Sequence, residues 1–239
     1  MKKISVYCIA ISLVALLSSC SEDGPSEAKY IFDPSVVCPA EGLNAYGEPM
    51  RGTFTDVRDG QTYKYTTIGT QVWMAQNLSY HDETYCLDKT CGAEFSYCIE
   101  EPCSIKGRFY RMNEALISCP SGWHLPSIDD WQLLFDNVGG IDSAGIRLKS
   151  TSGWTPLNPG QLSNGTDDCG FNLLPIPVND ISVNNKINRK KDGYVALEWT
   201  GTQMDSNRML GVFFETQTID VKNWNYYDDS LLPIRCVKD

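Results

Sequence analysis

The chain has 239 residues, and its 30 Asp and Glu side chains outnumber its 20 Lys and Arg side chains, which gives a formal net charge of -10. A negative chain repels the phosphate groups of nucleic acids and the headgroups of anionic lipids. The composition therefore argues against nucleic acid as a partner, and the length fits one large domain behind a leader, with two small domains as the alternative.

The N-terminal segment has the pattern of a secretory signal. Two lysines precede an apolar run over residues 4–17, which is shorter than the ~20 residues that a membrane-spanning helix needs. The next residues, Leu17-Ser18-Ser19-Cys20, resemble a lipobox, at which a bacterial signal peptidase cuts before a lipid-modified cysteine. We therefore expect a lipoprotein signal peptide over residues 1–19 and lipid on Cys20. The alternative is an ordinary signal peptide with an incidental cysteine.

Residues 20–29 form a polar segment that contains Gly24 and Pro25, and this composition predicts a flexible acidic tether. Its acids, Glu22 and Asp23, resemble the surface-export tag of some outer-membrane lipoproteins, and a plain solvated linker explains them equally well. The expected location is the cell envelope, as an outer-membrane lipoprotein that faces the periplasm or is exposed at the surface. Contact with the membrane is expected through the lipid anchor only.

The cysteines support export, because disulfides persist in oxidising compartments. Apart from Cys8 and Cys20, the candidates for pairing are Cys38, Cys86, Cys91, Cys98, Cys103, Cys119, Cys169 and Cys236. Sequence alone does not choose among their pairings, and the local pairs Cys86–Cys91 and Cys98–Cys103 compete with the nested pairs Cys86–Cys103 and Cys91–Cys98. The local C-x4-C spacing is at the edge of the range for zinc ligands and the chain has only 2 histidines, so we do not expect zinc.

The folded part begins after an irregular lead-in over residues 30–52. This stretch is rich in Pro and Gly, and we expect it to lie on the domain surface, held through Cys38. The domain itself is expected to cover residues 53–239. Near its start, the pair Asp59-Gly60 predicts a hairpin turn.

Two strands are predicted after this turn, over residues 62–68 and 71–75, from their Tyr, Thr and Val content. Residues 80–106 hold four cysteines and almost no apolar periodicity, which predicts a disulfide-stapled loop. Short helices are predicted near residues 113–117 and 143–149.

The strongest helix signal covers residues 128–138. Ser127 is a natural N-cap, and Asp130 stands three residues later, in the position of a capping box. Gly139 and Gly140 are expected to end the helix. The apolar residues that share one face are Ile128, Trp131, Leu134, Phe135 and Val138.

The second half of the chain is predicted to be mostly strand and loop. Residues 153–170 are expected to form a long polar loop, and strands are expected over residues 171–178, 194–200, 210–216 and 231–238. The sum is an α+β fold, in which a few helices pack on short, mostly antiparallel strands with long disulfide-stapled loops.

Four segments together resemble one protein family. They are DVRDGQTYKYTTIGTQVWMAQNL at residues 56–78, CPSGWHLPSIDDW at 119–131, LKSTSGW with GTDDCGFNLLP at 148–154 and 165–175, and IRCVKD at 234–239. Their order and spacing are similar to those of the Fibrobacter succinogenes major paralogous domain, found in exported bacterial proteins, over roughly residues 53–239. That family is similar in turn to the C-type-lectin-like and formylglycine-generating-enzyme-like folds, which implies a C-type-lectin-like architecture.

The resemblance also implies how some cysteines pair. It suggests a Cys119–Cys236 disulfide, across a loop long enough to contribute up to ~4.7 kcal/mol in the chain-entropy model. Where Cys169 stands, the family usually has an aromatic residue, so this cysteine is interpreted as an addition, with Cys38 as its candidate partner.

No catalytic site is predicted. Formylglycine-type chemistry in the distant relatives needs a second cysteine five residues before Cys236, and Leu231 stands there instead. A serine or cysteine nucleophile needs a histidine at its side, and we expect His124, in an apolar turn, to be a hydrogen-bonded structural residue. A carboxylate-based polysaccharide-active enzyme is the alternative, because acids are many, although no pair stands out.

Two segments are candidates for ligand binding, because lectin-like folds carry ligands on long loops. In residues 158–168 the candidate ligands of a structural Ca2+ ion are Asn164, Asp167 and Asp168. Within NWNYYDD the candidate glycan-binding residues are Trp224, Asn225, Tyr226, Tyr227, Asp228 and Asp229, because aromatic faces stack on sugar rings. The alternative is that Asn, Asp and Gly form turns and that the aromatic residues belong to the core.

These observations predict a non-catalytic, lipid-anchored surface domain that binds a glycan, another polymer or a cell-surface protein. The alternative is a structural or adhesion scaffold with no small ligand. Such a scaffold needs no special residues, so the sequence does not separate the two.

Overall fold

The structure is a computed structural model that describes residues 31–82, 96–98, 103, 105–178, 191–216, 224–227 and 230–239. For residues 97, 177, 178, 191, 192 and 224–227 it describes the backbone alone. The expected signal peptide, Cys20 and the tether lie outside these ranges, as do Cys86, Cys91, Asp228 and Asp229. Residues Ile31–Asp239 belong to one compact unit.

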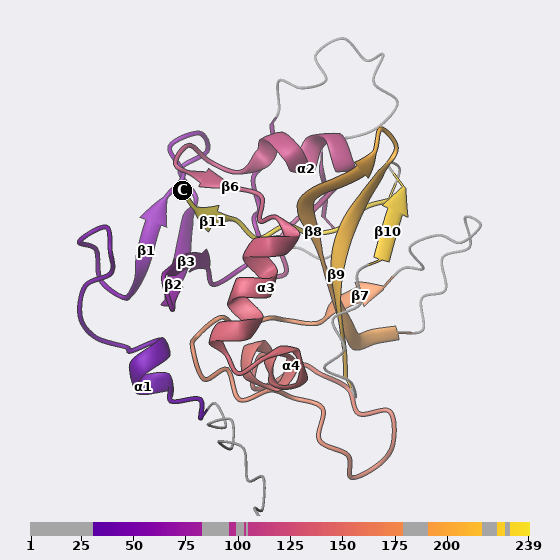
Figure 1. Cartoon of the computed structure of the whole chain (residues 1–239). Helices are drawn as coiled ribbons and strands as arrows, with labels where there is room; N and C mark the ends of the chain where they lie inside the picture. The colour runs from indigo at the N-terminus through magenta and orange to yellow at the C-terminus, as the bar shows by residue number, and fades with distance from the viewer. Residues whose placement is uncertain are drawn as a thin grey trace, which may run out of the picture. The chain divides into compact units, whose positions relative to one another are not determined.

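Five antiparallel strands form the first sheet, at the left of Figure 1. In pairing order they are β1 (Arg51–Thr55), β2 (Thr62–Ile68), β3 (Gln71–Met74), β11 (Val237–Lys238) and β6 (Trp123–His124). Val237 pairs with Trp73 on one side and with His124 on the other, so the last strand is inserted between β3 and β6.

Four antiparallel strands form the second sheet, at the right of Figure 1. In pairing order they are β10 (Trp224–Tyr227), β9 (Arg208–Glu215), β8 (Lys191–Asp205) and β7 (Ile176–Val178). A separate two-stranded sheet joins β4 (Ser96–Tyr97) to β5 (Phe109–Tyr110).

The helices are α1 (Pro34–Val37), α2 (Met112–Ser118), α3 (Ile128–Asn137) and α4 (Ile141–Leu148). The capping box forms as predicted, since Ser127 Oγ accepts from Asp130 N and Asp130 Oδ2 accepts from Ser127 N, at 3.1 and 2.8 Å. No helix within the described ranges combines the length and the apolar character that a bilayer crossing requires.

One aromatic side chain of α3 joins the two sheets. The ring centroid of Trp131 lies 4.9 Å from that of Trp73 in β3 and 6.2 Å from that of Phe214 in β9, and Trp131 is fully buried. Aromatic pairs of this kind contribute about 0.5–1.5 kcal/mol beyond the burial of their surface. In Figure 1, α3 accordingly lies between the sheets.

The α+β class is confirmed, and the local predictions agree closely with the structure. Strand β2 has the predicted bounds, and the three predicted helices correspond to α2, α3 and α4. The lead-in over residues 30–52 is less irregular than predicted, because Asp33 caps α1 and β1 begins at Arg51.

Two predicted strands are much shorter than expected. Only the end of the 231–238 strand is a strand, since the preceding backbone bonds to several different segments instead of one partner. The carbonyls of Leu232, Pro233 and Ile234 accept from Tyr110, Trp199 and Leu78 in turn. In the same way only Ile176–Val178 of the 171–178 prediction is a strand.

The NWNYYDD segment is also different from the prediction. Residues Trp224–Tyr227 form strand β10, paired with β9 from Trp224 opposite Gly211 to Tyr227 opposite Arg208, and do not form a ligand-carrying loop. Aromatic residues are enriched in strands, and this preference was the missed signal. The side chains of these four residues lie outside the description, so the glycan-binding prediction stays a prediction.

Candidate functional site

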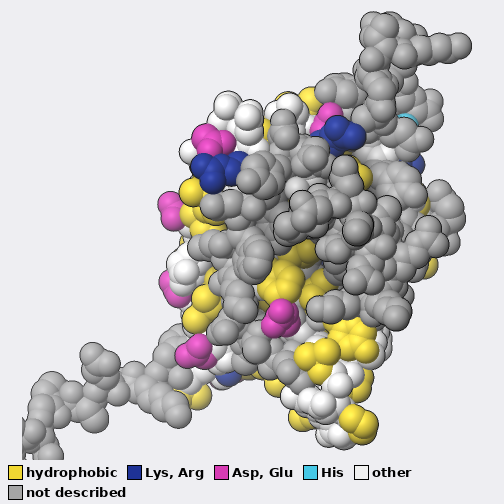
Figure 2. Space-filling model, turned by 90° about the vertical axis from the view of Figure 1, so that its right-hand side faces the viewer, with side chains coloured by type: hydrophobic (Ala, Val, Ile, Leu, Met, Phe, Trp, Pro, Cys, Tyr) yellow, Lys and Arg dark blue, Asp and Glu magenta, His cyan; other side chains and the backbone are white. Residues whose placement is uncertain are grey.

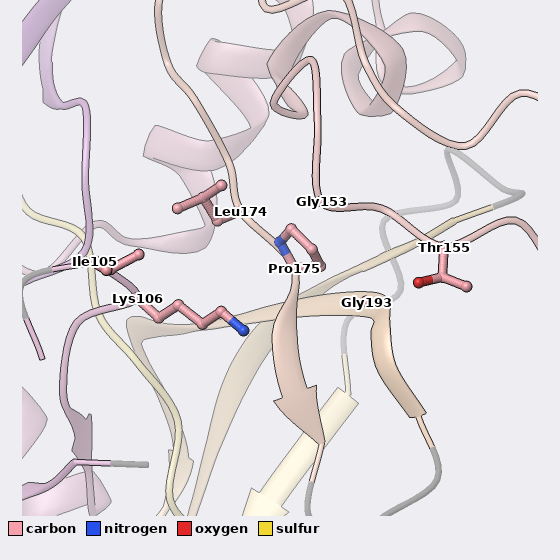
Figure 3. Close-up of a pocket in the computed structure, with 7 residues that line it drawn as sticks. All are labelled: Ile105, Lys106, Gly153, Thr155, Leu174, Pro175 and Gly193. Atoms are coloured by element: carbon pink, nitrogen blue, oxygen red, sulfur yellow. The ribbon is translucent and has the colours of Figure 1, made fainter. Parts of the chain in front are cut away.

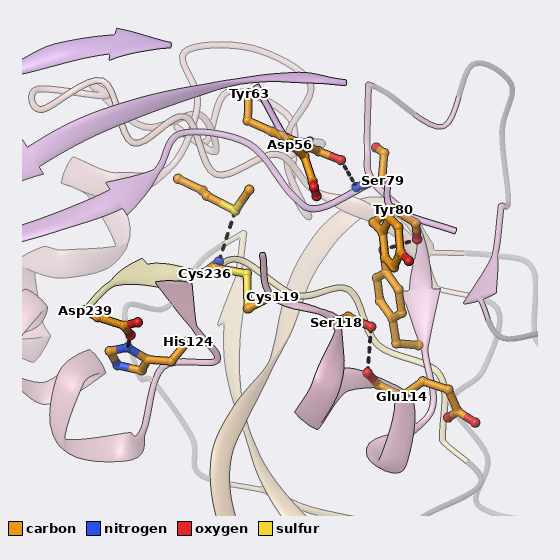
Figure 4. The surroundings of a disulfide bond; sticks show 12 residues. Asp56, Tyr63, Ser79, Tyr80, Glu114, Ser118, Cys119, His124, Cys236 and Asp239 are labelled. Carbon is orange, nitrogen blue, oxygen red and sulfur yellow. Dashed lines mark hydrogen bonds and ion pairs between the residues drawn. A yellow bond between two sulfur atoms is a disulfide. The ribbon is translucent and has the colours of Figure 1, made fainter. Parts of the chain in front are cut away.

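The Cys119–Cys236 disulfide joins the end of α2 to the segment that enters β11, across 117 residues of sequence (Figure 4). It is the pairing that the family resemblance implies. Backbone contacts hold Met74 of β3 beside it, because Met74 N donates to Cys236 O at 3.0 Å. The bond therefore fixes α2 against the middle of the first sheet.

A second long-range disulfide joins Cys38 to Cys169, 131 residues apart. Both cysteines are buried, at 1% and 0% exposure. Arg51 Nη2 donates to Cys38 O at 3.0 Å, and Thr66 Oγ1 donates to Cys169 O at 2.6 Å. The lead-in is thus held to the domain through Cys38, with the partner that the sequence suggested.

The third described disulfide is the local pair Cys98–Cys103. This bond rules out the nested alternative, which needed Cys103 for Cys86. Cys86 and Cys91 themselves lie outside the described residues.

Both histidines have hydrogen-bonding neighbours. His124 Nδ1 lies 2.7 Å from Asp239 Oδ1 (Figure 4). The Nε2 atom of His124 lies 3.4 Å from Asp130 Oδ2. Its side chain is 44% exposed, so it is a hydrogen-bonded residue at the surface and not in an apolar turn. The second ring, that of His81, has Nδ1 at 3.1 Å from Ser96 Oγ, a pairing that sequence reasoning missed.

The His81–Ser96 pair has the components of a nucleophile and a base, but not their accessibility. Ser96 is fully buried, and Arg108 Nη1 donates to its hydroxyl and its carbonyl oxygen, at 3.3 and 3.2 Å. Within the described ranges, no carboxylate is recorded at the other ring nitrogen of His81. The geometry suits a buried polar contact better than nucleophilic catalysis.

Three of the four family segments meet at a buried arginine. Arg235 Nη2 donates to Asn77 Oδ1 at 2.8 Å, Arg235 Nη1 donates to the carbonyl oxygen of Phe171, and its guanidinium lies over the Phe171 ring. Burial lowers the pKa of Arg235 to about 10, against the charges of Glu198 and Asp167, so it stays cationic at neutral pH.

Glu198 of β8 is a buried acid whose charge would interact with that of this arginine. It is fully buried, and burial raises the pKa of Glu198 to about 8, against the opposing influence of Arg235 and Asn77. A buried acid with a raised pKa is a common sign of catalysis, but structural pairs produce the same shift. Since both groups have no exposed surface to offer a substrate, we assign the pair to the core.

The LKSTSGW segment supplies a second buried cation. Lys149 is 5% exposed; its Nζ donates to Thr216 O at 3.2 Å and lies 4.7 Å from the ring centroid of Trp154. Burial lowers the pKa of Lys149 to about 8. The amine therefore ties the loop after α4 to the end of β9.

The three candidate calcium ligands take part in local structure. Asn164 Oδ1 accepts from Trp154 N at 3.0 Å, and Asp167 Oδ1 accepts from Asn172 N at 2.6 Å. Asp168 Oδ2 lies 3.9 Å from Arg147 Nε. Within the described residues, His, Cys, Asp and Glu side chains form no group of three suited to a metal ion.

A pocket of about 190 Å3 lies where four segments meet (Figure 3). Its described lining residues are Ile105, Lys106, Gly153, Thr155, Leu174, Pro175 and Gly193. Figure 3 shows the Lys106 side chain extended, with its ammonium group toward the segment that carries Pro175. This pocket could not be predicted from any single stretch of sequence, because each segment supplies only one or two of its lining residues.

Glycine is required on one wall of the pocket. Gly193 has a φ of 85°, and a Cβ there would lie 2.3 Å from Thr155 Oγ1 and 3.1 Å from Gly153 O. Thr155 N donates to Gly193 O at 2.8 Å, which closes the wall. The two segments therefore approach each other more closely than any other residue at position 193 would allow.

The surface on the side of the second sheet is mixed in character. Figure 2 shows hydrophobic side chains at the centre and along the lower edge of this face, with acidic and basic side chains scattered around them. The described side chains therefore form no single-sign charged surface on this face.

Comparison with curated proteins and with solved structures gives no match, so the likeness to C-type-lectin-like folds stays a prediction. The family model of the Fibrobacter succinogenes major domain matches residues 66–238, which is most of the folded unit. The matched range contains Asn77, Phe171 and Arg235, which the structure brings together. The chain therefore belongs to the Fibrobacter succinogenes major domain family.

Proposed function

We propose that this chain is an exported, lipid-anchored and non-catalytic domain that holds a glycan or another polymer at the cell envelope. The observation that carries the export is the pair of long-range disulfides, Cys38–Cys169 and Cys119–Cys236, which join buried cysteines. Such bonds form in oxidising compartments and are rare in the cytosol. The lipobox around Cys20 supplies the anchor in this proposal.

A binding role fits the described polar groups better than catalysis does. Glu198 and Ser96 are fully buried, and His124 is paired with Asp239 and Asp130 at the surface without a nucleophile beside it in the described structure. By contrast, the pocket around Lys106 is open to a ligand, and two of its seven described lining residues are glycines. A rigid, cross-linked body with such a pocket is suited to holding a ligand unchanged.

Export and anchoring are tested by labelling the full chain with radioactive palmitate in a bacterial host. The label is expected in the wild type and in the matched control Cys8→Ala, and is expected to be absent from Cys20→Ala. Alkylation without reductant is expected to leave Cys119 and Cys236 unmodified. Free alkylation of both, or label on Cys20→Ala, contradicts the proposal.

Binding is tested with a glycan array probed with the full chain in detergent, and catalysis with a polysaccharide panel. Selective binding without product release supports the proposal. Product release that disappears on changing one carboxylate shows an enzyme instead. Silence on the array, together with capture of one cell-surface protein, favours the scaffold alternative.

A further inference from the structure

One end of the domain has exposed apolar side chains on three neighbouring segments. It is the lower end in Figure 1, formed by α1 with the residues before it, by α4 and by the loop over residues 153–170. The large apolar side chains exposed on these segments are Ile31, Val36, Ile141, Ile146, Leu157 and Leu162. Single exposed apolar residues are common, but a group of them marks an interaction surface. We call this group the apolar end.

Contacts within the domain hold the three segments together. The Cζ of Arg147 in α4 lies 4.1 Å from the ring centroid of Phe32, so the chain beside Ile31 lies against α4. The carbonyl oxygen of Ile146 accepts from Thr166 N at 2.7 Å, which joins α4 to the loop. The residues of the apolar end therefore share one surface.

The loop presents its apolar side chains at a turn. Gln161 N donates to Asn158 O at 3.2 Å, so the chain reverses between Leu157 and Leu162. Leu157 is 52% exposed and Leu162 is 87% exposed. Figure 2 shows hydrophobic side chains along the lower edge of the molecule. Two leucines thus stand on either side of one turn, with much of their surface in water.

The chain that leads to the proposed lipid enters at the same end. Ile31 begins the compact unit and stands 11 positions after Cys20. A chain spans at most ~3.3–3.6 Å per residue, so Ile31 lies within about 40 Å of Cys20. Lipid on Cys20 therefore keeps the apolar end at a high effective concentration beside the bilayer. The opposite end of the domain is not held in this way.

Charge indicates which kind of lipid fits. Asp142 is an exposed acid of α4, and the loop contributes Asp167 and Asp168, of which Asp168 lies 3.9 Å from Arg147. Acidic groups repel anionic headgroups. The surface that suits the apolar end is therefore a zwitterionic one, which attracts it through apolar contact and not through charge.

We propose that Leu157 and Leu162 insert into the interface of a zwitterionic phospholipid bilayer and give the domain a second membrane contact beside its anchor. The inference rests on the proposed anchoring and goes beyond the proposed function. Such binding grows with the apolar area that enters the interface. The composition alone predicted contact through the lipid only, because composition does not show that the exposed apolar residues gather at one end.

The first test is fluorescence quenching of the lipidated chain in phosphatidylcholine vesicles with brominated acyl chains. Leu162→Trp adds a fluorophore to the loop. The matched control, Met204→Trp, replaces a residue that is 50% exposed near the tip of the β8–β9 hairpin, at the upper end in Figure 1. The wild-type signal is subtracted from both, and thermal unfolding checks that each variant is folded.

The tryptophan at position 162 is expected to be quenched about twofold more strongly than the one at position 204, because interfacial residues lie ~5–10 Å deep at the acyl boundary. Equal quenching of the two overturns the inference.

The second test is flotation of the unlipidated Cys20→Ala chain with phosphatidylcholine vesicles. Leu157→Ser/Leu162→Ser is expected to lower the bound fraction roughly tenfold, since two leucine side chains no longer leave water. Val57→Ser/Met204→Ser, the control pair of exposed apolar residues on the β1–β2 and β8–β9 hairpins, is expected to leave it unchanged. An equal loss in both pairs overturns the inference.

The anchor and the second contact fail separately. If Cys20 carries lipid but Leu162→Trp is quenched no more than its control, the second contact is wrong and the anchor stands. If Cys20 carries no lipid, the anchor is wrong and flotation alone decides, with no flotation overturning the inference. A lipid-free dimer that Leu157→Ser/Leu162→Ser dissociates also overturns it, because a second copy then covers the apolar end.

Discussion

The guanidinium of Arg235 lies over the ring of Phe171, with its Cζ 4.3 Å from the ring centroid. This contact joins the IRCVKD and GTDDCGFNLLP segments, and the bond from Arg235 to Asn77 adds the segment over residues 56–78. Three of the four sequence segments that resemble the family therefore meet at one buried cation, where they stabilise the fold.

Removing this cation is expected to destabilise the protein strongly. In Arg235→Met the Asn77 side-chain oxygen and the Phe171 carbonyl lose their donor, and buried Glu198 loses the nearby charge. Each buried acceptor left without its donor costs about 1–3 kcal/mol of unfolding free energy. Urea unfolding measures the loss.

The matched control is Arg208→Met. The Arg208 side chain is 41% exposed, and its Nη2 lies 2.7 Å from Asp205 Oδ2. An exposed pair contributes less than about 1 kcal/mol. A loss in Arg235→Met no larger than in this control would show that the buried cluster contributes little.

Glu198 is expected to make stability fall as the pH rises. The pKa of Glu198 is about 8 in the folded protein and its ordinary value is 4.5, so the folded state keeps a proton that the unfolded chain releases. Between these two values, each pH unit removes up to about 1.4 kcal/mol of unfolding free energy. Glu198→Gln is expected to flatten this slope, measured by urea unfolding from pH 5 to pH 8.

The exposed Glu41 provides the control, because Glu41→Gln removes a carboxylate at the surface. Its slope is expected to equal that of the wild type. Equal slopes for the wild type and Glu198→Gln would contradict the role given to Glu198.

The capping box of α3 is expected to lose its effect in acid. Burial raises the pKa of Asp130, but hydrogen bonds from Ser127 and the neighbouring His124 lower it by more, so that it lies below 3.8. The carboxylate therefore stabilises the fold above pH 3.8 and loses this effect as the pH falls through the lower folded value. Asp130→Ala is expected to cost about 1 kcal/mol at pH 7 and much less near pH 2.

Asp129→Ala is the matched control, because Asp129 is exposed in the same first turn and carries the same charge without the cap. Chemical unfolding at both pH values compares the two variants. A loss of the same size in both at pH 7 would assign the effect to charge near the helix start and not to the cap.

The long-range and the local disulfides are expected to differ in how much they contribute to the free energy of unfolding. In the chain-entropy model the Cys38–Cys169 bond, with its separation of 131 residues, contributes about 5 kcal/mol, and the local Cys98–Cys103 bond about 2 kcal/mol. Urea unfolding of Cys38→Ala/Cys169→Ala and of Cys98→Ala/Cys103→Ala gives the comparison. A larger loss in the local pair would contradict the model.

Local sequence signals made α3 predictable. Segments whose backbone hydrogen bonds come from distant parts of the chain were not predicted correctly. Ser127, Asp130 and Gly139 lie within a few residues of the helix that they start or end, so the sequence contains the whole signal. The segment from Leu232 to Ile234 instead receives its hydrogen bonds from three distant parts of the chain. Its apolar composition resembles a strand, but no single strand lies beside it.

The sequence around Glu198 contains a signal of its burial that the prediction did not use. It is one acid in the otherwise uncharged run YVALEWT, where residues 195–200 are all buried. A charge inside such a run suggests a buried partner. That Arg235 is the cation near Glu198 follows only from the structure, because 37 residues of sequence separate the two.

The Cys38–Cys169 bond also decides how mechanical tension would cross the molecule. If a pull enters from the N-terminal side and leaves through the segment after Cys169, the covalent route leaves the backbone at Cys38 and rejoins it at Cys169. That route bypasses residues 39–168, which contain β1 to β3 and the three helices α2, α3 and α4. Load along this covalent route would place little force on the hydrogen bonds of residues 39–168.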